Sequence, residues 1–451
     1  MTKKKYERPV IIRHQDGLSD KFGRSRGVRT MSKIDGVCVN ELAEEFGSPL
    51  FVFSEKDIRR KYSDAYRSFS MRYPKTQFAW SYKTNYLDAI CRIFHQEGSW
   101  AEVVSEYEYE MAERNGVPGH KILYNGPYKP IDSLKKALKE NAHIHVDHYD
   151  ELLAIEKIAI EEDKTFNLFM RVNMDTGIYP SWDRFGFNYD NGEAMNAARR
   201  MFSGGRLKLN GVHAHIGTFI LEPLAYKKEI EKLVEFTHAV ESELDFKIDY
   251  IDLGGGFPSN STLHEQYAPG EETNPPIDAY AETVASAMLA GGFHPDRLPT
   301  LLLETGRALI DHAGYMVTTV VANKRLANGV RSCVVDTGIN NLFTSFWYRH
   351  NVCPVEEKSG IFEETVIYGP LCMNIDVLRP SIRLPALAPG ERLVISPVGA
   401  YNVTQWMQFI RMRPAVVLIG KNGEIAKIRD AEDINVVKNL EHVPEWLKKK
   451  E

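Results

Sequence analysis

Short apolar runs alternate with stretches of helical periodicity over the middle of the chain, from about Pro49 to about Ala313. The run Ala142–Val146 precedes a helical stretch, and a second apolar run follows at Phe166–Val172. Repeated strand–helix units with short connections build parallel sheets, and a stretch of this length can close a (β/α)8 barrel. The pattern therefore predicts an α/β barrel domain over residues 49–313.

One helix of this region shows its buried face in the sequence. We expect it from about Ala225 to Leu244, between the strands Gly211–Ile216 and Lys247–Leu253. Apolar residues at helical spacing should lie on a sheet, and here they are Ile230, Leu233, Val240 and Leu244.

The pattern changes after Gly314 to β-branched runs separated by glycine and proline, such as residues 316–321 and 392–396. Such runs predict a mostly antiparallel β-barrel or sandwich domain over residues 314–451. We expect residues 1–48 to be an N-terminal segment that joins this β domain. The fold class is thus α/β plus β.

Composition narrows the class of protein without naming a function. A formal net charge of -5 gives no positive surface for nucleic acid, so we expect no nucleic-acid partner. We find neither a signal peptide after the basic start nor an apolar run that could span a bilayer, so we expect no membrane partner. Five scattered cysteines without a CxxC pair argue against disulfides or a structural metal site and suit a cytoplasmic location.

Lys83 follows the strand-like run FAWSY. A lysine in this place is most simply a solvated strand terminus. Its amine could also form a Schiff base at the carboxyl end of a barrel strand. A pocket that removes water, or that places another cation nearby, would lower the pKa of Lys83 and free the nucleophile.

Three glycines, Gly254–Gly256, directly follow the strand that ends at Leu253. Alone they indicate a flexible turn more often than a ligand site, but after a barrel strand they let backbone N–H groups approach a phosphate. Arg307 could add a charge-assisted contact to the same phosphate. Glu304 would be an unpaired acid unless it faces a pyridine nitrogen, which it would keep protonated.

Two histidines and two further side chains are open to more than one interpretation. His213 and His215 share one face of their strand. We interpret His213 as a hydrogen-bonded core residue and His215 as a ring that stacks on a cofactor. Cys372 is most simply a small buried hydrophobe, but its place after a Gly-Pro turn suggests a loop thiol that returns a proton to a carbanion. Tyr401 could be core packing or a phosphate ligand.

Together these motifs, in this order, resemble the fold-type III pyridoxal-phosphate decarboxylases, which include diaminopimelate, ornithine and arginine decarboxylases. The resemblance runs from about Ile34 to Pro414 and is nearest to the diaminopimelate branch. The segments that carry it include HAHIGT, DLGGGFP, ETGR, DTGINNL and GPLCMNID. It implies a TIM-like barrel that binds pyridoxal 5'-phosphate, a C-terminal β domain, and release of carbon dioxide from an α-amino acid by a carboxy-lyase.

The resemblance also implies individual roles. Lys83 would carry the cofactor, His215 would stack on its ring, Glu304 would bind the pyridine nitrogen and Cys372 would protonate the carbon that loses carbon dioxide. The other cofactor-binding residues would be Gly255, Gly256, Gly306, Arg307 and Tyr401. The family further implies a homodimer with the active site shared across the interface, in which Cys372 and Asp376 act on the partner's site.

Substrate recognition is expected at Thr344, Tyr348, Met373 and Asp376. Diaminopimelate decarboxylases carry an arginine at the position of Thr344 and a glutamate at that of Met373, and neither replacement can make the same contact. A milder departure is Glu102, where an aspartate is usual. We therefore expect another substrate, a diamino acid such as ornithine or lysine or a larger conjugated amino acid.

Three alternatives remain open. The first is decarboxylation of diaminopimelate itself, as in lysine biosynthesis, with the distal contacts rebuilt from other residues. The second is an amino-acid racemase, although the tyrosine typical of that role is not evident beside DTGINN and Cys372 favours decarboxylation. The third is a catalytically silent paralogue that regulates an active enzyme, which the presence of Lys83 and Cys372 disfavours.

Overall fold

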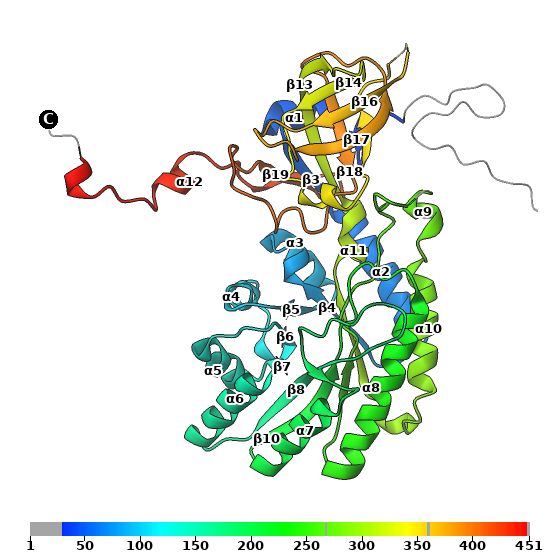
Figure 1. The fold of residues 1–451 in the computed structure, drawn as a ribbon, viewed down its shortest axis with the longest axis vertical. Coiled ribbons are helices and arrows are strands. Elements are labelled where there is room, and N and C mark those ends of the chain that lie inside the picture. The colour runs from blue at the N-terminus through cyan, green and yellow to red at the C-terminus, as the bar shows by residue number, and fades with distance from the viewer. Residues whose placement is uncertain (1–28, 267, 359–360, 449–451) are drawn as a thin grey trace, which may run out of the picture.

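The computed structural model describes residues 29–266, 268–358 and 361–448. Figure 1 shows a barrel of strands and helices with a β domain at one end, from which the C-terminal segment around α12 (Asn435–Lys438) extends. Among the described residues, none of the helices combines the length and the apolar character needed to cross a membrane.

Eight parallel strands close into a barrel, because β12 pairs with β4 at one seam and β10 pairs with β8 at the other. A further short strand, β9 (Phe187–Asn188), pairs with β8. The barrel strands are β4 (Thr76–Ser81), β5 (Trp100–Val103), β6 (Ile122–Tyr124), β7 (His143–Val146), β8 (Phe166–Asn173), β10 (Leu207–His213), β11 (Tyr250–Asp252) and β12 (Thr300–Thr305).

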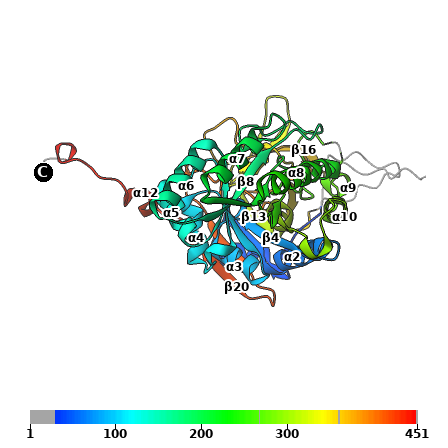
Figure 2. The same ribbon diagram turned by 90° about the horizontal axis from the view of Figure 1, so that it is seen from below.

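Helices surround this barrel, as the view from below in Figure 2 shows. They are α2 (Glu55–Ser70), α3 (Asp88–Gln96), α4 (Glu106–Arg114), α5 (Ile131–Lys139), α6 (Tyr149–Glu161), α7 (Glu193–Gly204), α8 (Pro223–Leu244) and α10 (Ile277–Leu289). The predicted barrel is confirmed, and the helix expected from about Ala225 to Leu244 is α8.

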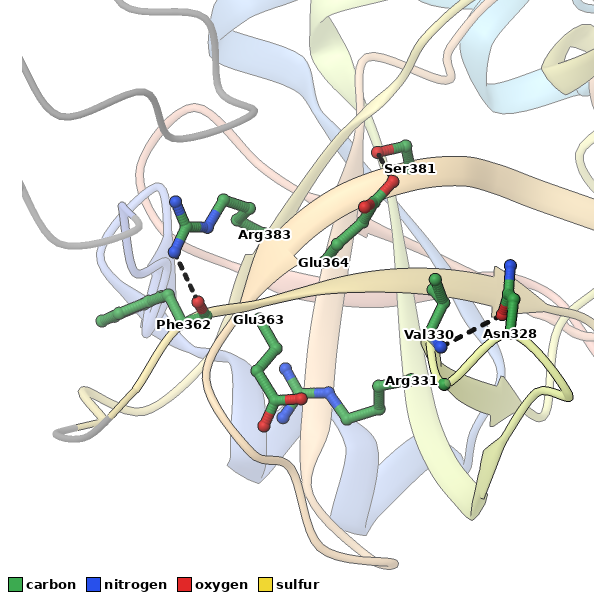
Figure 3. A pocket seen from close by; sticks show the side chains of 9 residues that line it. Asn328, Val330, Arg331, Phe362, Glu363, Glu364, Ser381 and Arg383 are labelled. Carbon is green, nitrogen blue, oxygen red and sulfur yellow. Dashed lines mark hydrogen bonds between the residues drawn. The ribbon is translucent and has the colours of Figure 1, made fainter.

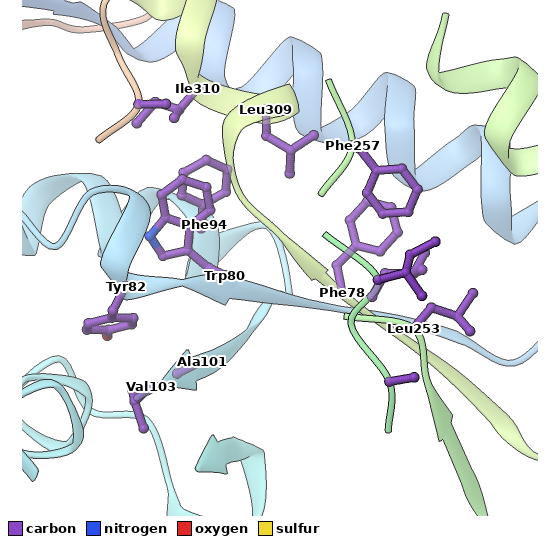
Figure 4. Close-up of a cluster of buried hydrophobic side chains, with 14 of the residues drawn as sticks. Phe78, Trp80, Tyr82, Phe94, Ala101, Val103, Leu253, Phe257, Leu309 and Ile310 are labelled. Atoms are coloured by element: carbon purple, nitrogen blue, oxygen red, sulfur yellow. The ribbon is translucent and has the colours of Figure 1, made fainter. Parts of the chain in front are cut away.

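Side chains that point outward from the strands pack against these helices. On β4, Trp80 stacks on Phe94 of α3 with ring centroids 3.7 Å apart (Figure 4). Phe78, two residues earlier, meets three aromatic rings of α2 edge-on, those of Tyr62, Tyr66 and Phe69. Such pairs bury large apolar areas, and they fix the opposite face of β4 toward the barrel interior.

The barrel interior changes from apolar to polar along each strand. Its floor contains Ala79, Leu123, Phe169 and Leu302, packed with Trp100 and Tyr250. Because side chains alternate along a strand, residues two places further on point the same way. There each of the eight strands, or for β6 the residue directly after it, contributes a buried polar side chain. We call this set the polar layer: Ser81, Glu102, Asn125, His145, Arg171, His213, Asp252 and Glu304.

The second sheet forms the β domain and is mostly antiparallel, as predicted; its parallel pairs in the described chain are β14 with β16 and β3 with β19. Its strands are β3 (Leu50–Ser54), β13 (Gly314–Arg325), β14 (Arg331–Val335), β15 (Asn351–Pro354), β16 (Glu363–Tyr368), β17 (Val377–Leu384), β18 (Arg392–Ser396), β19 (Ala415–Ile419) and β20 (Ile425–Arg429). Two short helices, α9 (Gly270–Thr273) and α11 (Arg307–Ile310), flank the strand ends of the barrel.

The N-terminal segment joins this β domain. Its elements are β1 (Lys33–Ile34), β2 (Val37–Cys38) and α1 (Val39–Phe46), whose apolar side chains pack against Val317 and Val394. Residues 1–28 of this predicted segment lie outside the described residues.

The strand β3, which we assigned from the sequence to the barrel, pairs instead with β13 and β19. All five of its residues are buried, as a central strand covered on both faces requires. A continuous apolar run looks the same in either sheet, so the sequence pattern did not separate the two possibilities.

We predict that Gly211→Ala destabilises the barrel. Gly211 lies on β10, and a Cβ atom there would overlap the ring of Phe169 on the neighbouring strand. Overpacking of this kind should lower the free energy of unfolding by about 1–3 kcal/mol, measured by urea unfolding followed by tryptophan fluorescence. Lys208→Ala, at an exposed position of the same strand, is the control and should change it by less than about 0.5 kcal/mol. Equal midpoints for the two variants would mean that the floor tolerates the extra methyl group.

Candidate active site

The candidate site lies at the carboxyl ends of the barrel strands, next to the β domain. Lys83 sits in the 3-10 turn η1 (Tyr82–Thr84) that directly follows β4. Its ammonium group donates to Glu102 of β5 and to the Ser81 hydroxyl 3.3 Å away. Its backbone carbonyl accepts a 2.8 Å hydrogen bond from the hydroxyl of Thr404, which lies between β18 and β19 of the β domain. The lysine is therefore held from both parts of the chain.

The charge state of Lys83 differs from the sequence-based expectation. Burial lowers the pKa of Lys83, but the carboxylates of Glu102 and Glu304 raise it by more, so that it lies above its ordinary value. We expected a pocket that removes water, or that places another cation nearby, to lower it. Burial does act in that direction, but the side chain in contact is the acid Glu102, which also accepts from Ser81, so Lys83 is a paired cation.

The glycine loop brings backbone close to the other groups of the site. Gly254 and Gly256 have φ angles of +60° and +91°, which favour glycine. A Cβ atom on Gly255 would overlap the carbonyl oxygen of Glu304. The N–H of Gly255 donates to Nδ1 of His215 at 3.1 Å. The three predicted pieces, the glycine loop, Glu304 and His215, are thus in contact.

Arg307 is a buried cation with unused hydrogen-bonding capacity. Its guanidinium lies between the rings of Tyr348 and Tyr401, at 4.7 Å and 4.8 Å from their centroids. Its Nε has no hydrogen-bond partner among the described residues, and its nearest acid, Asp311, is 3.6 Å away. Just before it, Gly306 leaves room for Thr84 in the turn of Lys83, because a Cβ atom would crowd that hydroxyl. A phosphate would meet the unused donors of Arg307.

Glu304 is a buried carboxyl group whose surroundings favour its protonated form. Its Oε1 accepts a 2.7 Å hydrogen bond from Asn125 and lies 3.5 Å from Nε2 of His213. Burial raises the pKa of Glu304 well above its ordinary value, and the negative charges of Glu102 and Asp252 add to this effect. Such a group can share a proton with a buried pyridine nitrogen.

His215 is held as a neutral ring. Burial lowers its pKa well below the ordinary value, and the cations Arg171 and Lys83 lower it further. Trp182 meets the ring edge-on with centroids 5.3 Å apart. A neutral, fixed imidazole suits stacking on a planar ligand. His213, in contrast, is fully buried in the polar layer, as the core interpretation expects.

The loop of Cys372 belongs to the β domain. Cys372 is exposed, contrary to its simplest interpretation as a buried residue, while Met373 is half-buried against the main core. Asp376 anchors the loop, because its carboxylate accepts 2.8 Å hydrogen bonds from the backbone of Ile339 and Leu371. Each of its oxygens accepts one hydrogen bond inside the chain, and its predicted substrate contact stays a prediction.

Two other predicted substrate residues are also buried. Thr344 is 1% exposed, and its hydroxyl donates to Asn402 and lies 2.9 Å from Nε2 of His350. It therefore belongs to an internal network rather than to an open substrate surface. Tyr348 is 4% exposed, and the guanidinium of Arg307 lies over its ring.

Sequence reasoning gave too little weight to Glu102 and did not identify Asn125 as a partner of Glu304. Both belong to the polar layer, where side chains point into the barrel near the carboxyl ends of the strands. Applying the two-residue alternation to every strand would have found them.

A cavity of about 650 Å³ lies elsewhere, in the β domain (Figure 3). Its lining includes Arg331, Glu363 and Arg383, and none of the predicted site residues. It is therefore separate from the candidate site.

Comparisons with known proteins agree with this geometry. Residues 55–311 match the family model described as "Pyridoxal-dependent decarboxylase, pyridoxal binding domain". A diaminopimelate decarboxylase of Methanothermobacter thermautotrophicus is 30% identical, over 92% of this chain and 97% of its own. One of Methanocaldococcus jannaschii is also 30% identical, over 88% of this chain and 92% of its own. A crystal structure of diaminopimelate decarboxylase from M. jannaschii in complex with L-lysine superposes with a TM-score of 0.84 at 28% identity, covering 94% of this chain and 99% of that one.

We predict that Glu102→Gln lowers the pKa of Lys83 in the cofactor-free protein, because it removes the nearest negative charge. The shift should be about one unit or more, measured as the pH dependence of Lys83 labelling by an amine reagent with peptide mass spectrometry. Glu106→Gln, at an exposed glutamate nearby in sequence, is the control and should leave the profile unchanged. An unchanged profile for Glu102→Gln would show that this ion pair does not set the charge of Lys83.

Proposed function

The chain belongs to the pyridoxal-dependent decarboxylases, nearest to the diaminopimelate decarboxylase branch, and we propose that it decarboxylates meso-diaminopimelate. It is a carboxy-lyase, and its cofactor is pyridoxal 5'-phosphate. The observation that carries the substrate proposal is the match to diaminopimelate decarboxylases over nearly the whole length of both chains. We further propose a cytoplasmic location, since an odd number of cysteines without close pairs suits a reducing compartment.

The residues of the candidate site fit the cofactor. Arg307 offers a buried cation with a free donor for the phosphate, and Gly255 brings backbone close to the same region. Glu304 offers a carboxyl group for the pyridine nitrogen, and Lys83 offers an amine for the aldehyde carbon. When bound, the cofactor accepts the electron pair released as the bond to the carboxylate carbon breaks.

The protein side chains position the reactants and move protons. Glu102 orients the Lys83 amine by accepting its hydrogen bond, and it can hold a proton that this amine loses on binding the cofactor and takes back when the substrate amine displaces it. His215 would cover one face of the ring and exclude water there. Cys372, on its exposed loop, returns a proton to the carbon that has lost carbon dioxide.

A second candidate substrate is a diamino acid without a distal carboxylate, such as ornithine or lysine. Thr344 and Met373 favour it, because neither supplies the charge that the resemblance assigns to recognition of the distal end of diaminopimelate. Thr344 is also engaged with Asn402 and His350. The similarity to diaminopimelate decarboxylases favours diaminopimelate, and we keep it as the first candidate. Its distal carboxylate and amine would then be bound by residues other than Thr344 and Met373.

We predict that carbon dioxide release from meso-diaminopimelate exceeds release from L-ornithine, L-lysine and their D-forms by about tenfold or more in kcat/KM. The measurement is a carbon dioxide assay across this panel with added pyridoxal phosphate, and Lys83→Ala is the inactive control. A different preferred amino acid would overturn the substrate while leaving the decarboxylase intact. Loss of optical rotation without carbon dioxide would indicate a racemase instead.

We also propose a homodimer in which the Cys372 loop completes the partner's site. Three loops connected by hydrogen bonds carry exposed apolar side chains, which a separate monomer would leave in water. These side chains are Phe346, Trp347, Ile375, Phe409 and Ile410. Their position beside the exposed thiol of Cys372 supports an interface that passes through the active site.

We predict that Lys83→Ala and Cys372→Ala, each nearly inactive, regain activity when mixed and allowed to exchange subunits. Half of the dimers would be mixed, and one of their two sites would be intact, so the mixture should reach roughly a quarter of the wild-type activity. Each variant alone, treated in the same way, is the control. Mixed dimers detected by native mass spectrometry without recovered activity would contradict a shared site.

A further inference from the structure

His145 is a buried histidine of the polar layer to which the proposed mechanism gives no role. It lies on β7 and is fully buried. Its Nε2 lies 3.2 Å from Oδ2 of Asp252, and its ring meets that of His213 edge-on with centroids 4.7 Å apart. Within the described residues, neither ring nitrogen makes a hydrogen bond of good geometry. A buried imidazole with such poorly satisfied nitrogens costs stability, which points to a function.

The contacts of His145 lead to Glu304. Nε2 of His213 lies 3.5 Å from Oε1 of Glu304, and nitrogen or oxygen atoms of His145, His213 and Glu304 all lie within 4.8 Å of one another. We call the four side chains Asp252, His145, His213 and Glu304 the buried relay. It connects two carboxyl groups across the barrel interior through two imidazoles.

The charge on Asp252 contributes to the proton affinity of Glu304. Burial raises the pKa of Glu304, and the carboxylates of Glu102 and Asp252 raise it further, while Lys83 and Arg171 lower it. The other titratable groups packed here are the neutral His213 on β10, the neutral His215 just after β10, and Glu229 on α8. Burial raises the pKa of Glu229 well above its ordinary value, and neither of its oxygens has a partner among the described residues. Asp252 is thus one of two acids that keep a proton on Glu304.

We propose that His145 is a positioning residue for decarboxylation: its Nε2, 3.2 Å from Oδ2 of Asp252, keeps a polar group beside that carboxylate and so helps to hold a proton on Glu304 and the pyridine nitrogen. Without this group, the buried Asp252 carboxylate keeps, among the described residues, the backbone N–H of Gly254 as its hydrogen-bond partner, and burial disfavours its charge. Glu304 then loses a negative neighbour and holds its own proton less strongly. The inference rests on the proposed role of Glu304.

The test is the protonation of the cofactor nitrogen itself, measured as the 15N chemical shift of ring-labelled pyridoxal phosphate bound to the enzyme, as a function of pH. We expect His145→Leu to move the titration to lower pH by about one unit or more. His145→Gln keeps an N–H donor, so its titration should lie close to that of the wild type. His143→Gln is the matched control: this histidine is two residues earlier on β7, stacked on Trp100 at the barrel floor, and should titrate as the wild type does.

Two further variants separate the possible failures. Asp252→Asn removes the charge directly and should move the titration in the same direction, so it carries the test if His145→Leu does not fold. A wild-type titration in both His145→Leu and Asp252→Asn would overturn the inference. If Glu304→Gln also titrated as the wild type does, the proposed role of Glu304 would fall as well, whereas a shift in Glu304→Gln alone would leave that role standing.

Discussion

Eight polar side chains, one from each barrel strand, are buried inside a closed ring of backbone, and their charges must balance there. A buried charge is tolerated only when it is paired or neutralised. The acids Glu102, Asp252 and Glu304 exceed the single arginine of this layer, Arg171. The balance is completed by the ammonium of Lys83 and by a proton on Glu304. The amine and the proton that a pyridoxal enzyme needs are therefore the two charges that make this interior stable.

The need to balance buried charge also means that the two ends of the cofactor require different protein groups. A pyridine nitrogen calls for a carboxyl group such as Glu304 of the polar layer, whereas a phosphate calls for cations and N–H donors. These lie outside the layer, where the strand ends of β11 and β12 give way to the glycine loop and to Arg307 on α11. The glycine loop and the polar layer can lie this close together because residue 255 is a glycine: any side chain there would overlap the backbone of Glu304.

Much of this arrangement could be predicted from the sequence, because it follows from strand ends. Lys83, His215, Glu304 and the glycine loop each follow an apolar run, and parallel strands bring their carboxyl ends together. The exceptions depend on contacts that a linear pattern does not contain. The burial of Thr344 depends on Asn402, far along the chain, and the anchoring of Asp376 depends on backbone N–H groups of another loop. The charge of Lys83 was misjudged because its neighbour Glu102 lies on the next strand, β5, and the inward-facing register that places it there was not followed along that strand.

Specificity has to arise outside the barrel. The charges of the polar layer balance one another deep in the barrel, and Arg307 lies against the rings of Tyr348 and Tyr401. These buried groups are better placed to hold a cofactor than to contact a substrate side chain. Of the predicted substrate residues, Thr344 and Asp376 make hydrogen bonds inside the chain, whereas Met373 lies beside the exposed Cys372 in one loop of the β domain. If that loop acts on a partner's barrel, substrate choice and dimer formation are set by the same surface, and a change in one should alter the other.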